Sequence, residues 1–165
     1  MIDIYEQIVL KLIEKNITVS AAESCTGGLL SSAFVDIPGS SDVFLEGVVT
    51  YSNDAKMRLG VNSDTLKKHG AVSEEVALQM ANAVKKRAGS MVGLSTTGIA
   101  GPGGGTPQKP VGLVYAAIVT DETENVYKFN FSGDRTSVRR QTVDFVINKL
   151  YDTINFPKEG ALNGK

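Results

Sequence analysis

The sequence predicts one α/β domain, a three-layer α/β/α sandwich around a mixed, mostly parallel sheet. Segments with helical periodicity alternate with short β-branched and aromatic runs, which is the pattern of a sheet covered by helices on both faces. The 165 residues, 42% of them hydrophobic, are enough for one core and too few for two. The short turn DETE, residues 121–124, permits only an antiparallel pair, so the sheet is expected to be mixed.

Helical periodicity and end signals define four main helices. The most clearly marked one begins after Ser73, which can cap it, has acidic residues in its first turn and stops at Gly89. The last helix is expected to bury one face, made of Val138, Thr142, Phe145, Val146 and Leu150. The helices are expected at residues 5–16, 27–37, 73–89 and 136–154.

Runs rich in β-branched and aromatic residues define five strands. They are expected at residues 17–23, 42–52, 91–98, 111–120 and 125–131, with short helices and loops over 53–71. The domain is expected to span residues 1–156, followed by a flexible tail over 157–165.

The charge, the hydropathy and the cysteine count argue against several classes of function. Seventeen basic and eighteen acidic residues give a formal charge of −1, so no overall field favours nucleic acid or an anionic membrane. No apolar run approaches the roughly 18 residues that cross a bilayer, and the acidic N-terminus is unlike a secretory signal. A single cysteine, Cys25, excludes an internal disulfide and agrees with a cytoplasmic location. We expect neither a nucleic-acid nor a membrane partner.

Two glycine-rich segments follow predicted strands. Residues 96–112, TTGIAGPGGGTPQKPVG, have glycines that would let backbone amides approach an anion, although a plain surface loop has the same composition. The segment lacks both the Walker A ending and the dinucleotide glycine spacing. In residues 21–30, AAESCTGGLL, Ser24 or Thr26 could cap the next helix, or Ser24 could be a nucleophile at a helix N-terminus.

A serine nucleophile needs a base. The sole histidine, His69, lies in a polar segment without an obvious acidic partner and suits a helix end better than a triad. Lys56 follows a strand end, with Tyr51 and Ser52 nearby, and can act as a base if burial lowers its pKa from about 10.4. A solvated lysine is the alternative, and Ser52, four residues before Lys56, is a second-choice nucleophile.

Other reactive groups have simple structural explanations. Cys25 could be activated at a helix N-terminus, but a buried, inert thiol is the favoured interpretation. Arg135, Arg139 and Arg140 could pair with a phosphate or form an exposed helix start. No metal-ligand set is recognisable, and we expect neither a metal nor an organic cofactor.

Five ordered motifs resemble the CinA C-terminal domain family, which includes stand-alone nicotinamide mononucleotide deamidases. They are AAESCTGGLL, PGSSDVFLEGVVTYSNDAK, GAVSEEVA, STTGIAGPGGGTPQKPVG and GDRTSVRRQ, and the similarity covers about residues 5–153. Full-length CinA proteins carry a further large N-terminal domain, and a chain of this length looks like the stand-alone form.

The resemblance implies a Ser/Lys amidohydrolase that converts nicotinamide mononucleotide and water to nicotinate mononucleotide and ammonia. Ser24 would be the nucleophile, Lys56 the general base and Tyr51 a proton-relay or orienting group. The implied substrate-binding residues are Thr26, Gly27, Gly28, Thr97, Gly98, Gly101, Gly104 and Arg135. Amides near residues 26–28 would hold the oxyanion, while the loop over 98–105 and Arg135 would hold the 5′-phosphate.

Two further expectations concern the protein as a whole. A non-catalytic nucleotide-binding or partner module of the same family is the competing interpretation. Strands presented at a sheet edge, together with the resemblance, favour a homo-oligomer, a dimer or a larger assembly.

Overall fold

The computed structural model describes residues 2–155, so the expected tail lies outside the described residues. The helices are α1 (Ile4–Lys15), α2 (Leu29–Val35), α3 (Asn53–Leu59), α4 (Ser63–His69), α5 (Glu74–Ala88) and α6 (Arg135–Asn155), with a short 3₁₀ turn at Ser40–Asp42. The strands are β1 (Val19–Glu23), β2 (Phe44–Val49), β3 (Val92–Gly98), β4 (Leu113–Val119) and β5 (Glu124–Asn130).

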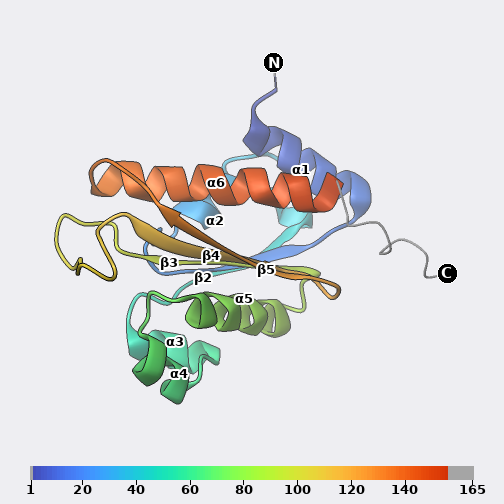
Figure 1. The fold of residues 1–165 in the computed structure, drawn as a ribbon. Coiled ribbons are helices and arrows are strands. Elements are labelled where there is room, and N and C mark those ends of the chain that lie inside the picture. The colour runs from blue at the N-terminus through green and yellow to red at the C-terminus, as the bar shows by residue number, and fades with distance from the viewer. Residues whose placement is uncertain (1, 156–165) are drawn as a thin grey trace.

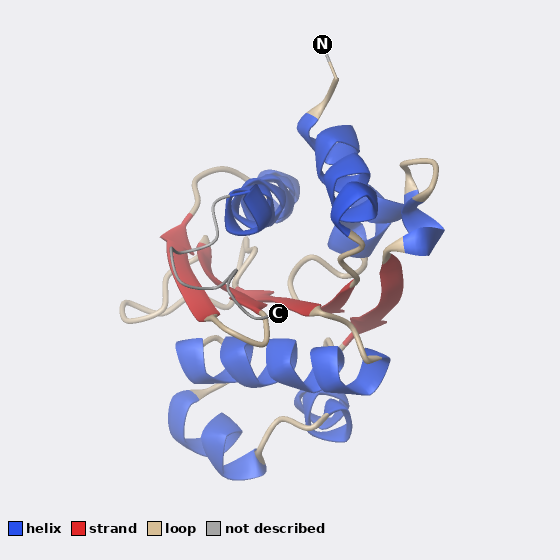
Figure 2. Ribbon diagram, turned by 90° about the vertical axis from the view of Figure 1, so that its right-hand side faces the viewer, coloured by secondary structure: helices blue, strands red, loops and turns tan. Residues whose placement is uncertain are grey.

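The expected α/β/α sandwich is confirmed. The strands form one five-stranded sheet, with α1, α2 and α6 on one face and α3, α4 and α5 on the other (Figures 1 and 2). Most of the core lies between the sheet and the α1–α2–α6 layer, and smaller apolar clusters lie under α5. No helix in the described part of the chain is both long and apolar enough to cross a bilayer.

The sheet is mixed, in the order β2-β1-β3-β4-β5. β1 pairs in parallel with β2 and with β3, whereas β4 is antiparallel to both β3 and β5. β4 therefore runs antiparallel to the other four strands, which share one direction. Of the four strand pairings, two are parallel and two are antiparallel. The DETE turn joins β4 to β5 as an antiparallel pair, as its length requires.

The topology places a switch point at the carboxyl ends of β1 and β3. After β1 the chain passes through α2 on one face to β2, and it returns through α5 on the other face to β3. β1 and β3 are neighbours, and the chain leaves β1 toward β2 on one side but leaves β3 toward β4 on the other. Ligands of open α/β sheets bind at such a switch point.

Local sequence signals predicted the ends of α5 correctly but not the start of α2. Ser73 caps α5 by accepting a hydrogen bond from the Val76 amide, and Gly89 ends it in the left-handed conformation, as predicted. α2 starts at Leu29 and not near residue 27, because Gly27 and Gly28 have φ of 56° and 98° and belong to the preceding turn.

The buried face of α6 differs in part from the expected one. Val143, Ile147 and Ile154 are buried together with four of the five expected residues. Phe145 is only partly buried, because its ring packs against the rings of Tyr127 and Phe129 on β5.

Candidate active site

The ends of three strands meet at the switch point. The register places Glu23, the last residue of β1, between Val49 of β2 and Thr96 of β3. Beyond this row the Ser24 amide donates to the Thr96 carbonyl at 2.9 Å. The Thr50 amide donates to the Glu23 carbonyl at 2.8 Å. The first residues after β1 and β2 are thus held side by side.

Lys56 and Ser24 form a buried pair at this point. Lys56 lies on α3, and its Nζ is 3.0 Å from the Ser24 Oγ. The same Nζ donates to the Thr50 carbonyl at 2.7 Å and lies 3.4 Å from the Tyr51 carbonyl oxygen. Lys56 is only 1% exposed and Ser24 only 8%. The interpretation of Lys56 as a solvated lysine is therefore wrong.

The surroundings of Lys56 favour its neutral form. Burial lowers the pKa of the Lys56 ammonium below its usual value, and a charge on nearby Cys25 is the smaller, opposing influence. Its hydrogen-bond partners in the described residues are a hydroxyl and backbone carbonyls, none of which carries a compensating negative charge. A lysine in this position is suited to accept a proton.

Tyr51 contacts Lys56 through its main chain only. Its side chain is 62% exposed, and its phenolic oxygen accepts a hydrogen bond from Arg135 NH2 at 3.0 Å. Its backbone carbonyl oxygen lies 3.4 Å from Lys56 Nζ. The role of Tyr51 as a proton-relay or orienting group stays a prediction, and the contact with Lys56 agrees better with orientation.

Glu23 is a residue of the candidate site that the sequence did not single out. The side chain is fully buried, and five hydrogen bonds from donors on four residues converge on its two oxygens. They come from the hydroxyls of Thr26 and Ser31 and from the amides of Gly28, Leu30 and Ser31, at 2.6–3.0 Å. Glu23 thus occupies the N-terminus of α2, so neither Ser24 nor Thr26 caps that helix. A glutamate that ends a buried strand just before a glycine turn was the available signal.

These contacts change the expected oxyanion donors. The Gly27 amide donates to the Ser24 carbonyl at 3.2 Å, and the Gly28 amide donates to Glu23. Each of these two amides therefore already has an acceptor, the Ser24 carbonyl for Gly27 and the Glu23 carboxylate for Gly28. Within residues 2–155 no acceptor is found for the Thr26 amide. The Thr26 hydroxyl is fully buried and bonds to Glu23 and Thr96.

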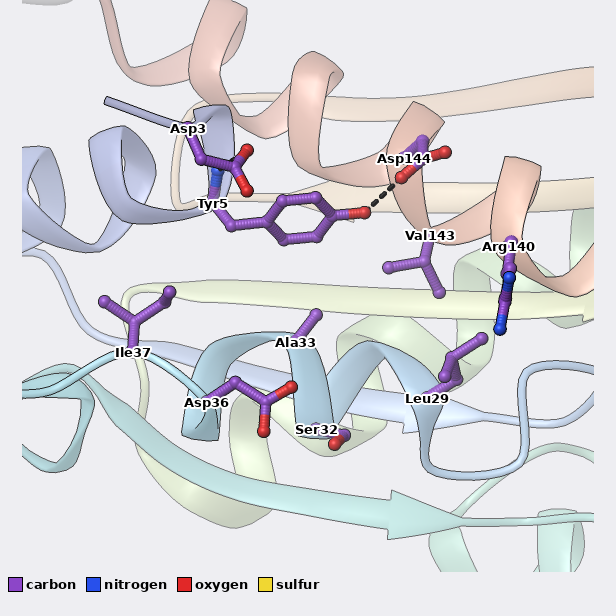
Figure 3. Close-up of a pocket in the computed structure, with 10 residues that line it drawn as sticks. All are labelled: Asp3, Tyr5, Leu29, Ser32, Ala33, Asp36, Ile37, Arg140, Val143 and Asp144. Atoms are coloured by element: carbon purple, nitrogen blue, oxygen red, sulfur yellow. Dashed lines mark hydrogen bonds between the residues drawn. The ribbon is translucent and has the colours of Figure 1, made fainter. Parts of the chain in front are cut away.

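The three arginines near the start of α6 have different surroundings. Arg135 bridges the Tyr51 phenol and the Gly101 carbonyl, so it links the glycine-rich loop to the site. Arg139 binds the carbonyls of Cys25 and Thr26, on the turn that carries Ser24. Arg140 instead lines a groove of about 350 Å³ between α1, α2 and α6, together with Tyr5 and Asp144 (Figure 3).

Steric contacts explain why glycine is required at several positions of the β3–β4 loop. A Cβ on Gly98 would lie 2.7 Å from the Leu113 carbonyl oxygen, and one on Gly101 would lie 2.5 Å from a Val111 methyl carbon. Gly101 and Gly104 also have φ above 80°. These glycines let the loop fold back onto the start of β4, whether or not it binds an anion.

Thr97 lies on the α5 side of the sheet and is 1% exposed. Its hydroxyl donates to the Ala71 carbonyl at 2.8 Å. A substrate contact by Thr97 would therefore use the hydroxyl oxygen as an acceptor. By contrast, the Thr50 Oγ1 is the one buried side-chain oxygen or nitrogen without a hydrogen-bond partner in the described part of the chain, and sequence reasoning did not single it out.

The alternative catalytic residues lack suitable surroundings. Burial raises the pKa of the Cys25 thiol to about 12, which agrees with an inert thiol. The Ser52 Oγ caps α3 by accepting from the Ala55 amide at 3.1 Å. His69 ends α4 as predicted, but it does have an acidic partner, because its Nδ1 lies 3.1 Å from Glu75; in the described residues it has no hydrogen bond to Ser24. Among the described residues, no group of three or more His, Cys, Asp or Glu side chains is arranged to hold a metal ion.

The fold and the site together define an α/β sandwich protein with a buried serine–lysine pair at the carboxyl edge of its sheet. A family model described as the CinA C-terminal domain matches residues 2–154. The chain belongs to the CinA C-terminal domain family.

Relatives and solved structures agree with this assignment. A putative competence-damage inducible protein from Clostridium perfringens is 56% identical over 147 residues, which are 88% of this chain and 36% of that protein. A CinA-like protein from Kosmotoga olearia is 51% identical over 145 residues, 87% of this chain and 35% of that protein. The chain spans about a third of the length of these curated relatives.

Among solved structures, a CinA superfamily protein from Klebsiella pneumoniae matches with a TM-score of 0.89 at 31% identity, over 92% of this chain and 96% of that one. A competence/damage inducible protein from Agrobacterium tumefaciens matches with a TM-score of 0.83 at 40% identity, over 94% and 98% of the two chains. The family relationship therefore extends across the whole sandwich.

Proposed function

We propose that this domain is a serine amidohydrolase that deamidates nicotinamide mononucleotide to nicotinate mononucleotide and ammonia. The observation that carries the proposal is the 3.0 Å distance between Lys56 Nζ and Ser24 Oγ in a buried site. The substrate is inferred from the CinA C-terminal domain family, which includes nicotinamide mononucleotide amidases. A cytoplasmic location remains part of this proposal.

The hydrogen bonds around Lys56 suit a neutral amine. A neutral amine has two hydrogens and one lone pair. The hydrogens can be donated to the carbonyls of Thr50 and Tyr51, and the lone pair then faces Ser24. In this arrangement the Ser24 hydroxyl donates its proton to Lys56, which is the geometry a general base requires.

The reaction then proceeds in two halves. Lys56 takes the hydroxyl proton while Ser24 Oγ attacks the carboxamide carbon, and negative charge develops on the former carbonyl oxygen. The carbon–nitrogen bond breaks, the proton passes from Lys56 to the leaving nitrogen, and ammonia departs from an acyl-enzyme. Lys56 next takes a proton from water, the hydroxide attacks the ester carbon, and Ser24 leaves with that proton.

Binding of the nucleotide is assigned to the mouth of the site. Arg135 is exposed and lies between the Tyr51 ring and the Gly101 carbonyl, so it supplies a cation near the entrance. Guanidinium groups bind phosphate oxygens in bidentate fashion. We assign the 5′-phosphate to Arg135 and the exposed part of the β3–β4 loop, and the aromatic face of Tyr51 is available to the pyridine ring.

A non-catalytic binding module is the competing proposal, and the buried lysine argues against it. Burying a lysine away from water costs free energy, and none of the hydrogen-bond partners of Lys56 carries a negative charge that would offset this cost. A binding module would gain nothing from holding Lys56 against a serine hydroxyl, whereas an amidohydrolase needs that contact.

The test is ammonia release from nicotinamide mononucleotide by the purified wild type, Ser24→Ala and Lys56→Ala proteins. We expect activity in the wild type and a loss of about 10³-fold or more in either variant, because the two residues act as a unit. Ser52→Ala is the matched control, since that serine is four residues before Lys56 and should be dispensable for chemistry. Circular dichroism checks that each variant is folded.

Two results would count against the proposal. A folded wild type that releases no ammonia would remove this substrate and favour the binding module, which binding calorimetry with the nucleotide would then test. Full activity in folded Ser24→Ala would remove the serine mechanism.

A further inference from the structure

Two charged side chains hold the turn at residues 24–28 from opposite sides. Glu23 holds it from the sheet, through the Thr26 hydroxyl and the amide of Gly28. Arg139 holds it from α6, with Nε 3.1 Å from the Cys25 carbonyl oxygen and NH2 2.8 Å from the Thr26 carbonyl oxygen. In the described residues neither side chain bonds to Ser24 Oγ or Lys56 Nζ, so both act on Ser24 only through the turn, Arg139 by backbone carbonyls alone.

The contacts of Arg139 fix the direction of two peptide groups. In a planar trans peptide the C=O and the following N–H point in opposite directions. With the Cys25 carbonyl held toward Arg139, the Thr26 amide is turned away from α6. With the Thr26 carbonyl held likewise, the Gly27 amide is turned to the opposite side, where it meets the Ser24 carbonyl at 3.2 Å.

The Thr26 amide is a donor that this arrangement leaves open. Within residues 2–155 neither it nor the Cys25 amide has an acceptor, whereas the Gly27 amide donates to Ser24 and the Gly28 amide to Glu23. It lies two residues beyond Ser24 in the turn that begins at the nucleophile. A positive charge on the carbonyl side also polarises the peptide group, which makes its N–H a stronger donor.

We propose that Arg139 is a positioning residue that, by holding the carbonyls of Cys25 and Thr26, aims the Thr26 amide at the oxyanion formed when Ser24 attacks an acyl group. Glu23 supports the same turn from beneath. This inference rests on the proposed serine chemistry, because the oxyanion belongs to acyl transfer at Ser24. It does not depend on which amide is the substrate.

The test compares Arg139→Gln with Arg140→Gln, its neighbour on α6. Arg140 is exposed and lines the groove of Figure 3, away from the site, so it controls for the loss of one positive charge on this helix. Two reactions are measured. For ammonia release from nicotinamide mononucleotide, kcat and KM are determined. For a fluorophosphonate probe, the rate at which it labels Ser24 is determined. In labelling, the Ser24 oxygen bonds to phosphorus, fluoride leaves, and charge develops on the phosphoryl oxygen as it does on an acyl oxyanion.

For Arg139→Gln we expect kcat and the labelling rate each to fall by about tenfold or more, with KM within about threefold, because an oxyanion donor acts in the transition state. Arg140→Gln should match the wild type in both rates. The thermal midpoint of each variant is measured as well. A purely structural role would lower the midpoint without separating kcat from KM.

Three outcomes would overturn the inference. Both rates of Arg139→Gln could stay within about threefold of the wild type, or KM could rise while labelling is unchanged, which would make Arg139 a substrate contact. A wild type that neither is labelled at Ser24 nor releases ammonia has no such oxyanion to stabilise. If Arg139→Gln does not fold, Arg139→Lys, which keeps the charge but not the rigid fork, is judged by the same criteria.

The probe separates this inference from the proposed function. A wild type that is labelled at Ser24 but releases no ammonia refutes nicotinamide mononucleotide as the substrate, and the labelling rates still decide the role of Arg139. Normal turnover in both arginine variants leaves the proposed function intact and removes the inference alone.

Discussion

Lys56 is a long charged side chain that the fold holds almost entirely out of water. Its contacts are the Ser24 hydroxyl and the carbonyls of Thr50 and Tyr51. Such surroundings penalise the ammonium form relative to water, and this is why the pKa of Lys56 is lowered. The same burial that makes Lys56 a plausible base at neutral pH should also be visible as a cost in stability.

This cost predicts a dependence of stability on pH. The pKa of Lys56 is lower in the folded chain than in the unfolded chain, where it is about 10.4, so between these values the unfolded chain binds more protons. The wild type should therefore gain stability relative to Lys56→Met as pH rises from 7 to about 10. Urea unfolding of both proteins at several pH values measures the difference.

The change with pH is the informative quantity, because Met also leaves the Thr50 carbonyl without its lysine donor. Parallel pH profiles for the two proteins would contradict a lowered pKa. If the proposed function holds, the same shift should make kcat/KM rise with pH up to the pKa of Lys56 and level off above it, since the proposed base is the neutral form.

Cys25 gives a second prediction for a single residue. With a pKa of about 12 the thiol stays protonated at neutral pH, and it packs against Ala100, Val114 and Val138. Cys25→Ala should keep ammonia release within about threefold of the wild type while losing about 1 kcal/mol of stability from packing. A folded variant with less than a hundredth of the wild-type activity would restore the cysteine as a candidate nucleophile.

At the scale of elements, α5 presses closely on the centre of the sheet. A Cβ on Gly93 of β3 would lie 2.2 Å from the Ala81 carbonyl oxygen and 2.7 Å from the Lys85 Cβ, both on α5. The glycine is what allows this approach. Because the Ser24 amide bonds to Thr96 of β3, the packing of α5 against β3 helps to fix the position of the strand end beside Ser24.

Gly93→Ala should therefore destabilise the fold by about 3 kcal/mol, since helix and strand must move apart. Gly103→Ala is the matched control: a Cβ there meets nothing within 4 Å, and a change within about 0.5 kcal/mol is expected. Denaturant midpoints of the two variants provide the comparison. Equal midpoints would mean that the helix can shift without cost.

The expected homo-oligomer belongs to the whole molecule and stays a prediction. The two edges of the sheet differ: β5 presents the charged side chains of Glu124 and Lys128. β2 presents Leu45 and Val49, which are 45% and 51% exposed. Charges protect an edge against pairing and apolar residues do not, so we expect a second copy of this chain to pair at β2.

Light scattering on a sizing column tests this prediction. The wild type should have at least twice the mass of one chain, and Leu45→Lys should shift it toward the monomer because a charge at the edge opposes pairing. Leu10→Lys is the control, since Leu10 is 47% exposed on α1, far from the edge in sequence and on another element. A monomeric wild type at micromolar concentrations would contradict the prediction.

The sequence by itself determined the order and type of the elements and pointed to the candidate site. Periodicity and caps such as Ser73 and Gly89 are local, so they could be interpreted without the fold. Ser24 and Lys56 were singled out because each follows a strand, and the carboxyl ends of strands are where α/β sheets gather their sites. The family resemblance suggested the substrate that is proposed.

Only the tertiary structure decided which side chains meet. Tyr51 turns its ring to Arg135 and only its carbonyl to Lys56, because the strand end fixes the backbone and leaves the side chain outside. Glu23 and Arg139 reach the nucleophile turn from different elements, and no local pattern encodes such a contact. The open amide of Thr26 depends on both. Local preferences thus define the segments, and the packing of distant segments defines the site.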